Sequence, residues 1–175
     1  MRILEVIAAL NQMQADGVVE SYAIGGAVGA TFHLEPVATL DVEVFVSFKA
    51  QKGSLIVSPQ PIFDYLKTKR ATAEGEYIVI GGWPVQFLPP TGPLIEEALE
   101  QAIETDVEGT IARIFTLEHL AAIALQTGRA KDKARLLQFV EAGTFDAKRF
   151  RDIIAKHGLV EAWQKFERQF LSDDQ

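Results

Sequence analysis

The sequence predicts an α/β (α+β) fold, with a mixed core over residues 1–115 and a helical region over residues 116–175 packed on it. Three patterns indicate this division. Apolar residues recur every three or four positions over residues 3–15, as in an amphipathic helix. Apolar and polar residues alternate over residues 41–48, as in a strand. After residue 116 the apolar spacing is helical throughout.

The core is expected to alternate helices with strands. Asp16-Gly17 ends the first helix, Gly81-Gly82 is a typical hairpin turn, and Pro89-Pro90 stops the strand before it. In chain order we expect a helix over 3–15, a strand over 22–24, a helix from 27 that ends before Pro36, a strand over 37–48, a short strand or loop over 54–57, a helix over 61–69, strands over 77–80 and 85–88, a helix over 94–103 and a strand over 110–115.

The helical region is expected to begin at Thr116, because a threonine side chain can accept a hydrogen bond from the first turn of a helix. No internal repeat or low-complexity segment interrupts it. We expect four helices, over residues 117–126, 131–141, 145–157 and 159–171.

The composition is that of an ordinary globular protein, with 48% hydrophobic and 23% charged residues in a chain of 175. The chain has no cysteine, which excludes disulfides and thiolate zinc sites and makes a reducing cytoplasm the expected location. Residues 1–14 lack the pattern of a signal peptide, and no apolar run has the length of a membrane span. We therefore expect a soluble, cytoplasmic protein.

The net charge of −7 is unevenly distributed. Residues 1–106 carry 14 acidic and 6 basic residues, whereas residues 107–175 carry 10 acidic and 11 basic residues. Seven of those basic residues lie between Arg129 and Arg151, with three acidic ones. Such a basic strip suits phosphates or nucleic acid, but charge alone favours the solvated faces of two helices.

Two features within residues 21–48 favour a functional site. Asp41 and Glu43 are separated by one residue on the expected strand, so their side chains share a face, and neighbouring carboxylates repel unless a cation lies between them. Phe45 is on the same face, which indicates that this face is partly covered. Gly25-Gly26 would let backbone N–H groups approach phosphate, or would simply form a tight strand-to-helix connection.

The segment from Gly25-Gly26 to Asp41-Val42-Glu43 resembles the nucleotidyltransferase superfamily. Members share a glycine pair, a helix and then a strand that carries two acids one residue apart. Thr39, two places before the first acid, belongs to the match. The resemblance implies a nucleotidyltransferase-type mixed sheet flanked by helices.

A second segment, residues 120–139, is similar to the helical part of small bacterial nucleotidyltransferase-like proteins. These include toxin-type enzymes of abortive-infection toxin–antitoxin systems. Arg129, Lys131 and Asp132 take the places of a basic residue and a Lys-Asp pair that punctuate two helices in those proteins. An antitoxin partner is an expectation from this resemblance.

The resemblance implies transfer of a nucleoside monophosphate from a nucleoside triphosphate, with ATP as the expected donor, to a hydroxyl group of unknown origin. The acceptor could belong to RNA, protein or a small molecule. Two Mg²⁺ ions would be held by carboxylates. The implied catalytic residues and metal ligands are Asp41 and Glu43, and the implied nucleotide-binding residues are Gly25, Gly26, Thr39, Arg129 and Lys131.

One residue departs from the family pattern. Members that are active usually bring a third carboxylate from a later strand, and the polar residue expected there is Gln86. Glu74 and Glu76 are the nearest acids in sequence. An alternative function is therefore a catalytically degenerate protein that keeps the fold as a nucleotide- or partner-binding regulatory module. A third reading is an unrelated α/β domain.

The three histidines, His33, His119 and His157, lie far apart in the sequence and match no metal-binding spacing. We expect each to be structural or on the surface.

Overall fold

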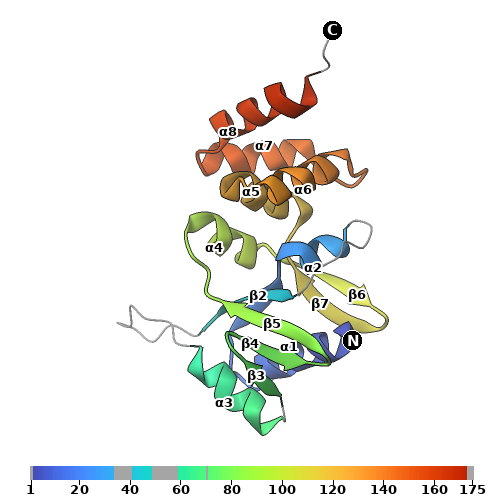
Figure 1. Ribbon diagram of the computed structural model, residues 1–175, viewed down its shortest axis with the longest axis vertical. Coiled ribbons are helices and arrows are strands. Elements are labelled where there is room, and N and C mark those ends of the chain that lie inside the picture. Colours follow the sequence, from blue (N-terminus) through green and yellow to red (C-terminus); the bar gives the residue numbers. More distant parts are fainter. Residues whose placement is uncertain (1, 34–40, 49–58, 70, 173–175) are drawn as a thin grey trace.

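The computed structural model describes residues 2–33, 41–48, 59–69 and 71–172 (Figure 1). Over these ranges the chain forms a seven-stranded mixed sheet with helices on both faces, followed by helices alone, which confirms the expected fold class. No helix within the described ranges is long and apolar enough to cross a membrane. The strands are β1 (Ser21–Ile24), β2 (Val42–Ser47), β3 (Thr72–Glu74), β4 (Tyr77–Ile80), β5 (Trp83–Leu88), β6 (Ile103–Val107) and β7 (Thr110–Ile114).

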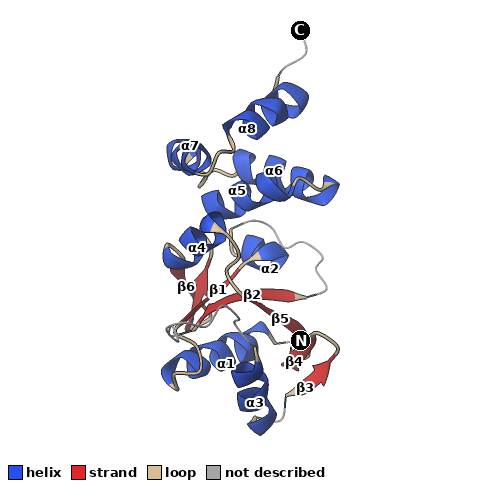
Figure 2. Ribbon diagram, turned by 90° about the vertical axis from the view of Figure 1, so that its left-hand side faces the viewer, coloured by secondary structure: helices blue, strands red, loops and turns tan. Residues whose placement is uncertain are grey.

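The helices lie in two layers around the sheet and in a stack beyond it (Figures 1 and 2). Those of the core are α1 (Ile3–Ala15), α2 (Gly26–Thr31), α3 (Gln60–Thr68) and α4 (Pro93–Glu100). Those of the C-terminal region are α5 (Leu117–Thr127), α6 (Ala130–Glu141), α7 (Ala147–Lys156) and α8 (Val160–Phe166), which a π-helical turn continues over Glu167–Leu171.

The strand order is β3-β4-β5-β2-β1-β7-β6. At the centre, β2 pairs antiparallel with β1 and parallel with β5. The hairpin between β4 and β5 turns at Gly81-Gly82 as expected, with φ of 57° and 79°. Those positive φ angles suit glycine and the type of turn that joins twisted antiparallel strands.

The two faces of the sheet support separate hydrophobic clusters. On one face, α1 and α3 pack against Val42, Val44 and Val46 of β2. On the other, Phe45 packs in a cluster that includes side chains of α4, α5 and α7. Phe45 is only 8% exposed, so the face that carries Glu43 is partly covered, as the sequence indicated.

Several predicted boundaries were wrong. The strand expected over 37–48 begins at Val42, and residues 37–40 lie outside the described residues. Asp41 is therefore just before the strand. The β2–β5 ladder begins at the pair Val42 and Val85, so Asp41 precedes it.

Two edge strands were missed, β3 and β6. The helix expected over 94–103 ends at Glu100, where Arg113 donates to the carbonyls of Leu99 and Glu100. Ile103 instead opens β6. All three residues of β3 are exposed, so no alternation marked it in the sequence.

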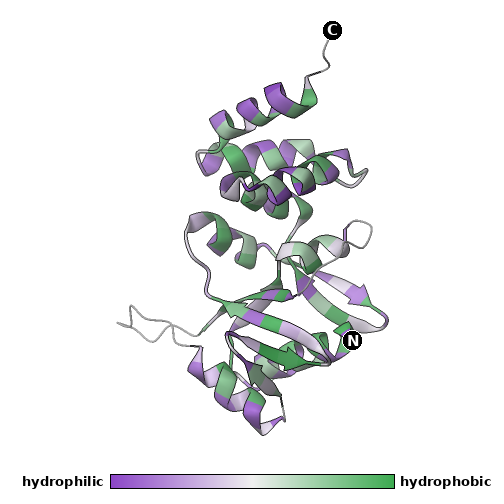
Figure 3. Ribbon diagram, in the orientation of Figure 1, coloured by the Kyte–Doolittle hydropathy of each residue, from purple (hydrophilic) through white to green (hydrophobic). Residues whose placement is uncertain are grey.

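The C-terminal helices match their predicted positions within two residues, apart from the π-helical turn at the end. Thr116 caps α5 as expected, because its hydroxyl accepts from the His119 N–H. Hydrophilic and hydrophobic residues alternate along these helices (Figure 3). A chain of ring contacts runs through Phe145, Phe150, Trp163, Phe166 and Phe170 and joins α7 to α8.

Candidate functional site

The two acids singled out in the sequence lie together at the start of β2. Glu43 is partly buried on the face that α2 and α5 cover. Burial raises the pKa of Glu43, and the nearby negative charge of Asp41 raises it further. A partly buried carboxylate beside a second one is the arrangement that a bound cation would relieve.

Three cations of α6 and the residue before it face this carboxylate. Arg135, Arg129 and Lys131 each lower the pKa of Glu43, but together they do not offset burial and Asp41. The site therefore joins acids from the core to bases from the C-terminal region. Sequence reasoning had placed Arg129 and Lys131 here and had not included Arg135 among the site residues.

Arg129 is the most constrained of the three. Its Nε donates to Asp132 Oδ2 at 2.7 Å, and its backbone N–H donates to the same oxygen at 3.2 Å. Asp132 is 4% exposed and is the third residue of α6, where its carboxylate accepts the hydrogen bond of the Arg129 backbone N–H before the helix. Arg129 is thus partly committed to holding α6.

The glycine pair is packed against the acidic strand. A Cβ on Gly26 would lie 2.2 Å from Glu43 Oε2, and Gly26 has φ of +58°. A Cβ on Gly25 would lie 2.8 Å from the Phe45 ring, which stacks on Phe115 with ring centroids 5.0 Å apart. The Gly25 N–H donates to the Glu43 carbonyl at 3.0 Å. Gly25 is therefore favoured by its close contact with the stacked Phe45 and Phe115 rings, and Gly26 by its positive φ, while a Cβ at 26 would displace the Glu43 carboxylate.

The neighbouring strand brings Gln86 beside the acids. In the parallel β2–β5 register Glu43 lies opposite Gln86, the position that the sequence analysis singled out. The Gln86 amide donates to Glu76 Oε2 at 3.3 Å. Burial raises the pKa of Tyr77, with further contributions from Asp41, Glu76 and Glu43. Tyr77 and Glu76 are thus close to Asp41, Glu43 and Gln86. The sequence had not indicated that Tyr77 is near this site.

A small pocket of about 60 Å³ lies between the two regions at this point. Its volume is well below the roughly 300–1,000 Å³ of pockets that enclose drug-sized ligands. Its lining includes charged side chains (Glu43, Arg129, Asp132 and Arg135) and apolar ones. Gly26 and Glu43 line it from the core, and Leu120, Ile123, Ala124 and Arg135 line it from the C-terminal helices.

The side chains present fit one Mg²⁺ ion better than two. Among the described residues, no group of three His, Cys, Asp or Glu side chains is arranged to hold a metal. Mg²⁺ is commonly held by one or two carboxylates together with substrate phosphates and water, which Asp41 and Glu43 could provide. The protein groups described here do not add the third carboxylate of a two-ion site. Thr39 lies outside the described residues.

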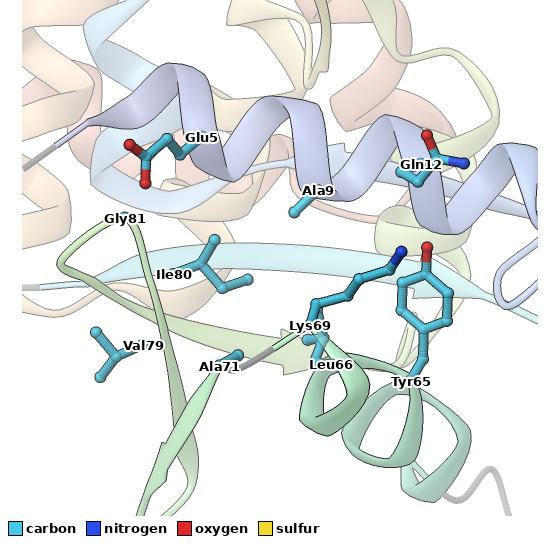
Figure 4. A pocket seen from close by; sticks show the side chains of 10 residues that line it. All are labelled: Glu5, Ala9, Gln12, Tyr65, Leu66, Lys69, Ala71, Val79, Ile80 and Gly81. Carbon is cyan, nitrogen blue, oxygen red and sulfur yellow. The ribbon is translucent and has the colours of Figure 1, made fainter.

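A larger cavity of about 410 Å³ is on the other face of the sheet (Figure 4). It lies between α1, α3 and β4, with Lys69 and Tyr65 at one end and Glu5 at the other. None of the predicted site residues lines it.

No protein-family model matches the chain, and no curated protein matches it in sequence. Solved structures do match. One is the crystal structure of an antigenic nucleotidyltransferase-like protein from Paracoccidioides brasiliensis, with a TM-score of 0.60, 12% identity, and coverage of 92% of this chain and 91% of that chain.

Two structures of ANT(2'')-Ia also match. The crystal structure in complex with adenylyl-2''-tobramycin has a TM-score of 0.47 and 12% identity, and covers 95% of this chain and 98% of that chain. The solution structure of this antibiotic-resistance factor has a TM-score of 0.47 and 11% identity, and covers 95% and 90%. At these identities the likeness to the Paracoccidioides protein shows a nucleotidyltransferase-like fold and nothing finer.

Proposed function

We propose that the protein transfers a nucleoside monophosphate from a nucleoside triphosphate to a hydroxyl acceptor, with Mg²⁺. The observation that carries this proposal is the position of Glu43. Its carboxylate is partly buried, lies against Gly26 and Asp41, and faces three cations of the C-terminal region. Carboxylates, which are the ligands that Mg²⁺ prefers, and cations, which suit phosphate, are thereby close together in a nucleotidyltransferase-like fold, and this supports the proposal.

Each residue has a distinct role in this proposal. Asp41 and Glu43 would hold the ion, and Mg²⁺ when bound would stabilise negative charge on the triphosphate. Lys131 and Arg135 would contact phosphate oxygens, while Arg129 would place α6 through Asp132. Gly25 and Gly26 keep the backbone close to Glu43. The acceptor oxygen would bond to the α-phosphorus as the bond to pyrophosphate breaks.

A second function is favoured by a specific observation, the position of Gln86 opposite Glu43. A neutral amide in place of a third carboxylate weakens the case for a second ion and for rapid turnover. In this reading the chain binds nucleotide, or a partner, as a regulatory module without transferring it. The two functions share the site and differ in chemistry.

A transfer assay separates these functions. Each of ATP, CTP, GTP and UTP, labelled at the α-phosphate, is incubated with the protein, Mg²⁺ and either a tRNA pool or cell-extract proteins. Labelling that disappears in Asp41→Asn supports transfer. Nucleotide binding without labelling of any acceptor supports the regulatory module instead.

Three finer assignments are part of the proposal. ATP is the first donor to test, and a cytoplasmic location is expected from the sequence. A role in a toxin–antitoxin system, with an antitoxin partner, is supported by the sequence resemblance of residues 120–139. A partner gene beside this one, whose product suppresses growth arrest caused by this protein, would support that role, and arrest that the neighbouring product does not relieve would contradict it.

A further inference from the structure

A buried carboxylate on α4 joins the core to the C-terminal helices. Glu97 is 8% exposed, and its Oε2 accepts from Nε2 of His119 at 3.1 Å and from Nε2 of His157 at 2.9 Å. Its Oε1 accepts from Nζ of Lys156 at 2.5 Å. We call these four residues the Glu97 cluster. Glu97 belongs to the core, and its three donors come from α5 and from the end of α7.

The hydrogen bonds of this cluster are all accounted for. His119 Nδ1 lies 2.7 Å from the hydroxyl of Thr116, and that hydroxyl also accepts from the His119 N–H at 3.1 Å. A neutral His119 that donates from Nε2 and accepts at Nδ1 satisfies every contact. Thr116 is 2% exposed and His119 is fully buried, so this hydroxyl–imidazole–carboxylate chain is closed to substrates.

The Glu97 cluster is one of the contacts that hold α5 over the pocket at Glu43. One turn of α5 carries His119 and then Leu120, and the helix continues with Ile123 and Ala124, which line the pocket. That pocket is too small for a nucleotide while these helices are in place. Their attachment to α4 therefore acts on its width, together with the apolar contacts that Leu117 and Leu120 make in the cluster around Phe45.

We propose that the Glu97 cluster is a positioning device that holds the C-terminal helices closed over the Glu43 pocket and releases them in acid. The functional consequence, control of nucleotide entry, rests on the proposed function. The attachment of the C-terminal helices to α4 does not rest on the proposed function, because it consists of the hydrogen bonds of Glu97 with its three donors.

The pH dependence has a definite sign. Burial raises the pKa of Glu97, but the hydrogen bonds from Lys156, His157 and His119 outweigh burial and hold it at about 2, against an ordinary value of 4.5. Burial lowers the pKa of His119 from its ordinary 6.5, and Glu97 offsets only part of this. Both attached-state values lie below the ordinary ones, so attachment is strongest above pH 6.5 and weakens as pH falls.

Other charges around the cluster act in the same region. Arg149 of α7 lowers the pKa of His119. Arg149 also opposes the effect of burial on the pKa of Glu118, which Asp146 and His33 also influence. Release is thus expected in two steps, below pH 6.5 through His119 and between pH 4.5 and about 2 through Glu97.

The chain has no cysteine, so a pair of spin labels can be placed at will. Lys67→Cys on α3 and Gln138→Cys on α6 are exposed positions on the two sides of the molecule. The distance distribution between the labels is measured without nucleotide from pH 8 to pH 3.5. We expect a single distance at pH 8 and a longer population that grows as pH falls. Fluorescence of Trp83, in a Trp163→Phe background, confirms that the core stays folded.

Glu97→Gln should show the longer population already at pH 8, whereas Glu96→Gln, an exposed neighbour on α4, should match the parent. If Glu97→Gln does not fold, His157→Gln provides the test, and we expect its longer population to appear at a higher pH than in the parent. A distribution that stays constant from pH 8 to pH 3.5 while the core is folded would overturn the proposal. So would a folded Glu97→Gln that matches the parent. Neither outcome depends on whether nucleotide binds.

Discussion

Gly26 and Glu43 lie so close together that the first limits where the second can go. The Cβ of any other residue at 26 would meet Glu43 Oε2 at 2.2 Å, and the positive φ adds backbone strain. The backbone conformation thus favours glycine at 26, and a side chain there would push the Glu43 carboxylate aside. A glycine before a strand that carries two acids can be explained in this way, because a side chain at the glycine position and the carboxylate would occupy the same space.

Gly26→Ala should cost about 1–2 kcal/mol of unfolding free energy from the left-handed backbone, and it should also displace Glu43. Gly17→Ala is the matched control, because Gly17 has φ of +75° and no atom within 4 Å of its missing Cβ. Denaturant unfolding measures the first effect and nucleotide binding the second. Binding by Gly26→Ala equal to that of Gly17→Ala would contradict the close contact between Gly26 and Glu43.

The ionisation of Glu43 should oppose folding. Since its pKa is raised above the ordinary 4.5, its contribution to stability is present below pH 4.5 and is lost as pH rises through the raised pKa. Glu43→Gln should therefore be at least as stable as the parent at pH 7 in melts without Mg²⁺. A clear loss of stability in Glu43→Gln would show that this carboxylate is a structural partner of the α6 cations instead.

At the scale of elements, the β2–β5 register decides which side chain stands beside Glu43. Because the strands are parallel and in contact, Gln86 lies opposite Glu43, and the hairpin to β4 brings Glu76 to the Gln86 amide. Asp41 is before the ladder. A single amide-to-acid change on β5 would therefore place a third carboxylate at this site.

Gln86→Glu should raise Mg²⁺ affinity at least about tenfold, because a unit charge a few ångströms from a divalent ion contributes more than about 1.4 kcal/mol at a partly buried site. Repulsion should also lower stability without Mg²⁺. Melting with and without Mg²⁺ measures both effects. Gln164→Glu on α8 is the control for charge alone, and an equal response of the two variants would exclude Gln86 from the metal site.

The α6 cations are predicted to act on phosphate. The double change Lys131→Ala and Arg135→Ala should weaken ATP binding at least about 100-fold, since hydrogen bonds to charged groups contribute about 1.5–3 kcal/mol each. Lys133→Ala, on the same helix and not among the cations that shift Glu43, is the control. The loss should shrink at high salt. Equal affinity of the double variant and the control would remove α6 from the site.

Much of this arrangement could be predicted from the sequence, because it follows from local patterns. Alternation over residues 41–48 predicted that Glu43 and Phe45 share a face. Gly81-Gly82 predicted the hairpin that joins β4 to β5. The strand boundary at Asp41 could not be read, because the alternation of side chains runs through Asp41, whereas the β2–β5 ladder begins at Val42. The hydrogen bonds of His119 and His157 to Glu97 also depend on packing between helices that are distant in the sequence, so no residue spacing predicts them.

At the scale of the whole molecule, the site lies at the junction of two regions. The core provides Gly26, Asp41 and Glu43, and the C-terminal helices provide the cations and the cover. The Glu97 cluster holds the second region to the first on the same side of the sheet. Binding of a ligand at Glu43 should therefore depend on both regions and on the contact between them.

The most direct test of the account is calorimetric titration of ATP, CTP, GTP and UTP at pH 7.5, with and without Mg²⁺. We predict binding of at least one nucleotide at a single site that requires Mg²⁺. Its affinity should fall about 100-fold or more in Glu43→Gln and stay unchanged in Glu104→Gln, an exposed acid on β6. Absence of binding by all four nucleotides would contradict the account, as would binding of equal affinity in Glu43→Gln and the parent.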